Sequence, residues 1–177
     1  AIEASFDRCG HLASFISNLA QVIRIPEPTF SLISLNEQAR SVYSLTSIEC
    51  RQRNIELSLS LTDNDQYIHV DGIQFEQVLV NIIKNAYEAI GENGRIKIST
   101  HHSPLSIIIE DNGPGISEEA KQKLFTPFFT TKSSGQGIGL MFVREVLTNH
   151  RCRFSLSTEE GYTRFKIFFP TADGTYS

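Results

Sequence analysis

The chain lacks the features that would place it in a membrane, on nucleic acid or among disulfide-rich proteins. No apolar run approaches the ~20 residues that a membrane-spanning helix needs. There are 16 basic and 20 acidic residues, giving a net charge of −4 without a long basic run, which disfavours a nucleic-acid binder. Cysteine is scarce and scattered (Cys9, Cys50, Cys152), so we expect reduced thiols, no zinc site and a cytoplasmic setting.

Two common phosphate-binding glycine motifs are also missing. No G-x-x-x-x-G-K-[ST] occurs, and "GQGIGL" has Leu140 where the last glycine of a dinucleotide motif would fall. A P-loop and a dinucleotide fold are therefore disfavoured. The opening "AIEASFDRCGH" has neither an initiator Met nor a basic signal region, so we expect a piece of a longer protein. Whether that parent is anchored in a membrane stays open.

The composition that is present, 40% hydrophobic and 20% charged in 177 residues, is typical of one soluble globular domain with a short addition. Apolar residues recur at helical spacing over residues 1–25, and Pro26 and Pro28 end that helix. We therefore expect an N-terminal helix (1–25), a linker (26–29), the main domain (30–171) and a tail (172–177).

Within the main domain, strand patterns and helix patterns are interspersed, and two strands follow each other as a hairpin. This favours an α+β two-layer sandwich, a mixed β-sheet covered on one face by helices, with the N-terminal helix appended. The expected strands are "FSLISL", "IELSLSL", "YIHV", "RIKIST", "LSIIIED", "RFSLST" and "TRFKIFFP". The expected helices run from an N-cap at Asn36 to about Arg53, from Gly72 to Ile90 after a capping Asp71, from Ser117 to Leu124, and from Ile138 to His150.

The helix "FEQVLVNIIKNAYEAI" carries the first chemical signal. One face is an apolar stripe, and a second face carries Asn81 and Asn85, one turn apart. Asparagine is a poor helix former, because its amide competes for backbone hydrogen bonds. A ligand for the two carbonyl oxygens would explain the pair, and Mg²⁺ bound to nucleotide phosphates fits. A plain solvated polar face is the alternative at this point.

The segment "IIIEDNGPGI" carries the second signal. An apolar strand ends in Asp111, followed by a turn with Gly113 and Gly115. A carboxylate there could accept a hydrogen bond from an exocyclic amine such as that of adenine, and the glycines would allow close approach to a ligand. An ordinary strand-to-helix turn is the alternative.

In combination and in this order, the motifs resemble the ATP-binding catalytic domain of sensor histidine kinases, a branch of the gyrase, heat-shock chaperone, histidine kinase and MutL ATPase superfamily. The resemblance covers about Phe30 to Pro170, and "RIPEP" and "PFFTTK" look most like the nitrogen-regulatory subgroup. The matched segments are the N box (Asn81 to Ala89), the first glycine box (Asp111 to Gly115), the F box (Leu124 to Lys132) and the second glycine box (Gly135 to Gly139).

The resemblance implies Mg²⁺ and ATP as cofactors and a role for each matched residue. Asn85 would bind Mg²⁺, Asn81 would lie near metal and phosphates, and Lys132 would reach the terminal phosphates from a lid over Phe125 to Ser134. Asp111 would bind adenine, with Thr163 assisting through water. The base pocket would be shaped by Gly113, Gly115 and Ile116, and the phosphates wrapped by Gly135, Gly137, Gly139 and Leu140. Phe125, Phe128 and Phe129 would either anchor the lid or present a surface to the acceptor helix, and anchoring is favoured because apolar rings rarely stay exposed without a partner.

Asn81 also bears on the reaction. Superfamily members that hydrolyse ATP carry Glu one turn before the Mg²⁺-binding Asn, and an amide cannot act as a general base. We therefore predict transfer of the γ-phosphoryl group to a histidine. His11, His69 and His150 lack the acid and Asn-Pro that follow the acceptor in the family, so the acceptor is expected outside this sequence.

The implied partners are the parent's dimerisation hairpin, of which 1–25 would be the second helix, a response regulator, and a second copy in a homodimer. Two alternatives remain: a degenerate nucleotide-sensing module, and an ATP-hydrolysing or serine-kinase member of the same superfamily.

Overall fold

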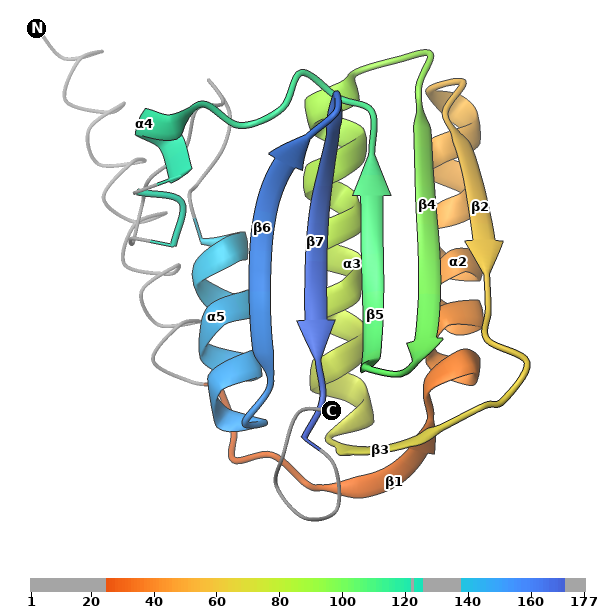
Figure 1. Ribbon diagram of the computed structural model, residues 1–177, viewed down its shortest axis with the longest axis vertical. Coiled ribbons are helices and arrows are strands. Elements are labelled where there is room, and N and C mark those ends of the chain that lie inside the picture. The colour runs from red at the N-terminus through yellow and green to blue at the C-terminus, as the bar shows by residue number, and fades with distance from the viewer. Residues whose placement is uncertain (1–24, 122, 126–137, 171–177) are drawn as a thin grey trace, which may run out of the picture.

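The computed structural model describes residues 25–121, 123–125 and 138–170. The predicted N-terminal helix and most of the predicted lid lie outside these residues. A five-stranded sheet, ordered β2-β4-β5-β7-β6, forms one layer, and α2, α3 and α5 cover one of its faces (Figure 1). The elements are β1 (Ser31–Ser34), α2 (Leu35–Gln52), β2 (Glu56–Ser60), β3 (Tyr67–Val70), α3 (Gly72–Ile90), β4 (Arg95–His102), β5 (Leu105–Asp111), α4 (Glu118–Lys121), α5 (Gly139–Asn149), β6 (Arg153–Glu159) and β7 (Tyr162–Phe168).

The sheet is mixed, as the sequence predicts. β2 and β4 pair in parallel, because the connection between them passes through β3 and crosses the sheet as α3. The β4–β5, β5–β7 and β6–β7 pairs are antiparallel. All three long helices of the described residues cover the same face, so the α+β sandwich is confirmed. Among the described residues, every helix is too short or too polar to span a lipid bilayer.

Helix α3 supplies much of the core. Asp71 caps it by accepting hydrogen bonds from the backbone N–H groups of Ile73 and Gln74, as expected. Its apolar stripe is buried between the sheet and the neighbouring helices, and only Ile90, at the C-terminal end, is partly exposed. The buried members of the stripe are Phe75, Val78, Leu79, Ile82, Ile83 and Ala86.

The predicted cap of α2 is wrong by two residues. Ser34, not Asn36, is the N-cap, and its hydroxyl oxygen accepts the N–H of Glu37 at 2.9 Å. Asn36 is buried in the first turn, where its amide donates to the carbonyl of Thr62 and accepts from the Thr100 hydroxyl. A tertiary hydrogen-bond network therefore takes this side chain away from the helix terminus.

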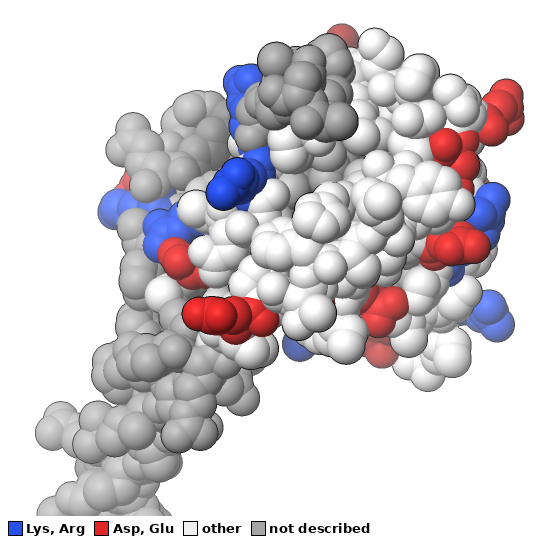
Figure 2. Space-filling model, turned by 90° about the horizontal axis from the view of Figure 1, so that it is seen from below, with Lys and Arg blue, Asp and Glu red and all other residues white. Residues whose placement is uncertain are grey.

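Two further features of the fold differ from expectation. The helix predicted from Ser117 to Leu124 is only the single turn α4. The strands β1 and β3 pair with each other as a separate two-stranded ribbon instead of joining the main sheet. One face of the ribbon packs on the core, and the other exposes Leu32 and Tyr67. The ribbon lies at the lower end of the molecule in Figure 1, and Figure 2, seen from below, shows a largely uncharged surface there.

Buried His150 joins the end of α5 to the start of α3. Its Nδ1–H donates to the carbonyl of Val146 at 2.7 Å, and its Nε2 accepts the backbone N–H of Asp71 at 3.0 Å. Both ring nitrogens are thus used by the neutral imidazole, and a proton on Nε2 would break the bond to Asp71. Burial lowers the pKa of His150, although the Val146 bond and the Asp71 charge oppose that effect.

We expect the free energy of unfolding to fall as pH drops from about 7.5 to about 5.5, because the unfolded chain then takes up a proton that folded His150 resists. Urea titrations across this range measure it. His150→Gln should flatten the slope, whereas His102→Gln, at an exposed strand position, should leave it unchanged. Equal slopes in all three proteins would contradict the assignment.

Candidate functional site

The two asparagines of α3 lie beside the start of α5. A carbon placed at the Cβ position of Gly139 would be 3.7 Å from Asn81 Oδ1 and 3.9 Å from Asn85 Nδ2. The helix α5 begins without a side-chain cap, since Ile138 makes no capping hydrogen bond. Its first N–H groups and the amide side chains thus meet in one place, which can bind phosphate and an oxygen-liganded cation together.

Asp111 occupies the last position of β5 and is 7% exposed. Its Oδ1 accepts the N–H of Gly113 at 2.8 Å, and Oδ2 has no partner among the described residues. Burial raises the pKa of Asp111, the Gly113 bond opposes this, and the charge of Glu110 adds to it. Thr163 on β7 is buried directly opposite. The pair offers a buried acceptor and a hydroxyl, suited to a ligand amine.

The turn after Asp111 is held against β6. Gly115 has a φ of +80°, and a Cβ there would lie 2.8 Å from Thr158 Cγ2, so glycine is required both for conformation and for space. The next residue, Ile116, donates its N–H to the Thr158 hydroxyl oxygen at 3.0 Å. Thr158 is thus a candidate site residue that the sequence did not predict. No local signal could reveal it, because it lies 42 residues away along the chain.

The two halves of the site meet along α3. A Cβ on Gly113 would lie 3.5 Å from Ile90 Cγ1, so the Asp111 turn packs on the C-terminal end of the helix. Asn85 precedes Ile90 by five residues, which is about 7.5 Å along the helix axis. One extended ligand can therefore reach from the acidic turn to the asparagines.

Several predicted site residues cannot be placed. Lys132, Gly135 and Gly137 lie outside the described residues. Leu140 is half-buried and packs on the core. Phe125, the first aromatic residue of the predicted lid, packs edge-on against Phe154 with ring centroids 5.4 Å apart. That contact fits an anchoring role for Phe125.

A separate hollow of about 430 Å³ opens near the same end of the sheet, and it contains no predicted site residue. Its walls include Arg51, Asn54 and Arg95, and Asn112 separates it from the Asp111 turn. Asn112 Oδ1 accepts the N–H of Arg95 at 2.7 Å, which ties the turn to the start of β4. The hollow is polar and exposed, so the buried acceptor of Asp111 is the stronger candidate for a ligand.

Comparison with known proteins agrees with this geometry. The family described as "Histidine kinase-, DNA gyrase B-, and HSP90-like ATPase" matches residues 70–173. The sensor histidine kinase ZraS of Escherichia coli is 29% identical over 158 residues, covering 88% of this chain and 34% of that protein. The signal transduction histidine-protein kinase AtoS of Escherichia coli is 32% identical over 159 residues, covering 88% of this chain and 26% of that protein. This chain spans about a third of the length of such curated relatives.

Solved structures show the same similarity. The catalytic domain of histidine kinase ThkA is 35% identical, with a TM-score of 0.73, and the match covers 80% of this chain and 95% of that one. ThkA in complex with the response regulator protein TrrA matches with a TM-score of 0.76 at 28% identity, over 94% of this chain and 50% of that one. The family match spans more than half of this chain, which therefore belongs to the histidine kinase-, DNA gyrase B- and HSP90-like ATPases, as a catalytic domain of the sensor histidine kinase type.

Proposed function

We propose that this domain binds Mg-ATP and transfers the γ-phosphoryl group to a histidine on the dimerisation hairpin of its parent protein. The observation that carries the proposal is the convergence on α3. The start of α5 meets Asn81 and Asn85 near the middle of that helix, and the Asp111 turn packs on its end. An ATP molecule laid along α3 would place its adenine at Asp111 and its phosphates at the asparagines.

Asp111 is the proposed adenine-binding residue. Its Oδ1 is already used by the N–H of Gly113, which leaves Oδ2 to accept from the 6-amino group. Thr163, opposite on β7, would hold a bridging water. The backbone of Gly113, Gly115 and Ile116 would form the rim of the base pocket.

Mg²⁺ would be held by Asn85, with Asn81 beside it. Among the described residues no cluster of three or more His, Cys, Asp or Glu side chains could hold a metal. A cation at this site would therefore rest on amide oxygen, water and phosphate, a set that Mg²⁺ accepts. When bound, it would neutralise phosphate charge. Lys132, Gly135, Gly137, Gly139 and Leu140 are the proposed phosphate-binding residues of the lid and the second glycine cluster.

The residues of α3 favour transfer over hydrolysis. Asn81 stands one turn before Asn85 and cannot deprotonate a water. Glu76, the nearest acid preceding it on α3, accepts a hydrogen bond from the Ser41 hydroxyl at 2.6 Å and so is engaged with α2. Without a general base, this site suits catalysis by positioning and charge neutralisation. A degenerate nucleotide sensor and a hydrolysing ATPase are the competing functions.

The proposal extends to the parent protein. By the family resemblance, it would be a homodimer of the nitrogen-regulatory subgroup, with a cytoplasmic catalytic domain and a response regulator as the recipient of the phosphoryl group. The solved ThkA–TrrA complex supports the last point.

Asp111→Asn should weaken ATP binding by about tenfold or more, because Oδ1 stays with the N–H of Gly113 and the oxygen that would accept from the adenine amine becomes an NH2 donor. The melting temperature should be unchanged or higher, since the variant removes a buried carboxylate whose raised pKa shows that its charge is disfavoured. Calorimetric titration and thermal unfolding measure the two effects. Exposed Asp63→Asn is the control, and a stable Asp111→Asn protein with full affinity would contradict the adenine assignment.

Asn85→Ala should abolish the increase in nucleotide affinity that Mg²⁺ produces, because the metal loses its protein oxygen. At saturating Mg²⁺ the nucleotide affinity of the variant should therefore be about tenfold lower than that of the unaltered protein. Titration of a fluorescent ATP analogue with and without Mg²⁺ measures it. The control is Gln77→Ala, on the exposed side of the same helix. Binding that ignores magnesium in the unaltered protein would instead favour the degenerate sensor.

Mixing the chain with a separate hairpin that carries the acceptor histidine should yield acid-labile phosphohistidine in the presence of Mg-ATP. Radiolabelled transfer followed by acid treatment detects it. The same hairpin with its histidine changed to Gln is the control. Steady release of phosphate without labelled hairpin would identify a hydrolase and contradict the interpretation of Asn81.

A further inference from the structure

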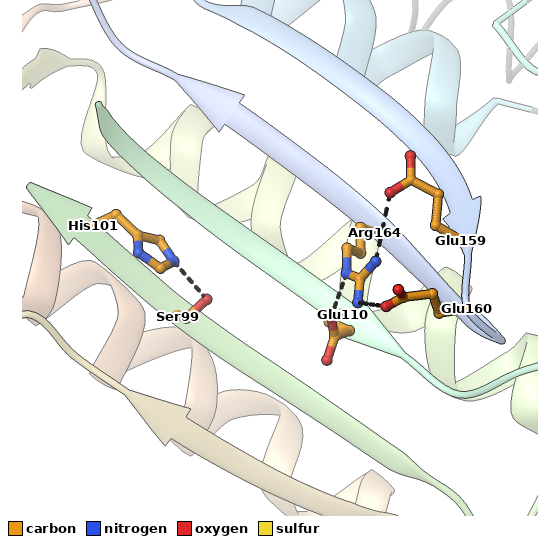
Figure 3. A network of polar contacts seen from close by, with 6 residues as sticks. All are labelled: Ser99, His101, Glu110, Glu159, Glu160 and Arg164. Atoms are coloured by element: carbon orange, nitrogen blue, oxygen red, sulfur yellow. Dashed lines mark hydrogen bonds and ion pairs between the residues drawn. The ribbon is translucent and has the colours of Figure 1, made fainter. Parts of the chain in front are cut away.

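Arg164 joins three acidic side chains on the face of the sheet opposite α2, α3 and α5 (Figure 3). Its Nε donates to Glu110 Oε2 at 2.5 Å, and its two terminal nitrogens lie 3.7 Å from Glu159 Oε2 and 3.9 Å from Glu160 Oε2. The side chains of Arg164 and Glu110 are 21% and 27% exposed, so this pair is better shielded from solvent than the other two.

The position of this pair in the sheet ties it to the proposed adenine site. Glu110 and Arg164 are directly opposite on β5 and β7, and the next pair along is Asp111 and Thr163. Successive residues of a strand point to opposite faces, so the ion pair and the site residues are on opposite sides of the same two strands. The Asp111–Thr163 pair is also the last of its ladder, where strands fray most readily.

The same guanidinium reaches the tip of the β6–β7 hairpin. The two loop residues, Glu160 and Gly161, have φ of +55° and +79°, as in a tight type I′ turn. One residue before β6 ends at Glu159, Thr158 holds the Gly115–Ile116 turn through the bond from Ile116 N–H. Arg164 therefore ties together the end of β5, which carries Asp111, and the hairpin, which supports the glycine turn.

We propose that Arg164 is a positioning and specificity-determining residue for the purine base, acting across the sheet through Glu110 and the β6–β7 tip. The inference rests on the proposed function, because it takes Asp111 as the group that binds the 6-amino group. Arg164 cannot touch the nucleotide itself. It holds the last pair of the β5–β7 ladder in register, so that Asp111 Oδ2 keeps its direction toward the base. Without it, Glu110 would also be an unpaired carboxylate next to Asp111.

A comparison of ATP with inosine triphosphate separates this role from general stabilisation of the fold. The two nucleotides share ribose, triphosphate and ring shape, but inosine has a carbonyl where adenine has the amine. A carboxylate accepts a hydrogen bond from the amine and repels the carbonyl. The ratio of the two affinities therefore reports the placement of Asp111, while any change shared by both nucleotides cancels.

The experiment measures the dissociation constants of both nucleotides, with Mg²⁺, for the full chain and for Arg164→Met. Arg164→Met should lower the preference for ATP by about fivefold, the loss expected when one hydrogen bond is weakened, with little change in the affinity for inosine triphosphate. The matched control is Lys166→Met, two residues along the same strand on the same face, which should keep the full preference. Glu110→Gln keeps the shape of the Glu110 side chain but removes its charge, which weakens the ion pair with Arg164. It should therefore also lower the preference for ATP over inosine triphosphate.

Each outcome is decisive. An unaltered protein that binds both nucleotides equally contradicts the adenine assignment of Asp111. A normal preference for ATP that survives in both Arg164→Met and Glu110→Gln overturns the role of Arg164 and leaves the proposed function intact. Equal losses for both nucleotides show a purely structural role. If Arg164→Met fails to fold, Glu110→Gln alone decides between these results.

Discussion

The burial of one face of α3 is the constraint on which the rest of the structure depends. Its stripe includes Phe75 and Ile83, both fully buried. Burial of each such side chain stabilises the folded state by about 1.5–3 kcal/mol. With one face held against the sheet, the rotation of the helix is set, and Asn81 and Asn85 must then face α5. If α3 rotated about its axis by one residue, the asparagine amides would be buried and isoleucine side chains exposed. Burial of the apolar face therefore fixes the direction of the polar face.

The helix is also the meeting point of elements that are remote in sequence. Gly139 of α5 approaches its middle and Gly113 approaches its end, and a Cβ at either glycine would be in van der Waals contact with α3. The candidate site therefore lies where α3 meets the start of α5 and the turn after β5. Asp111 is buried and has an oxygen that no described residue uses, so its charge is costly to bury and that oxygen can accept a hydrogen bond from a ligand.

The two faces of the sheet carry different kinds of contact. The covered face carries the core and the acidic end of β5, and the open face carries the network of Arg164. Because neighbouring residues of a strand point in opposite directions, a contact on the open face can govern the geometry on the covered one without approaching the ligand. His150, at the C-terminal end of α5, also fixes the site from a distance. Its two hydrogen bonds hold that helix against the start of α3.

Most of the helices and strands, and the motifs that suggest the candidate site, could be predicted from local patterns in the sequence. Apolar periodicity predicted α3 with its stripe and the start of α5. Capping preference predicted Asp71, and two adjacent strand patterns predicted the β4–β5 hairpin. All of these signals are local to the element that they describe. Tertiary structure alone decided the cap of α2, where the network around Asn36 moved the cap to Ser34. It also decided the separate β1–β3 ribbon, the role of Thr158 and the pairing of Glu110 with Arg164. Such contacts join residues dozens of positions apart, and no local pattern encodes which strand lies beside which.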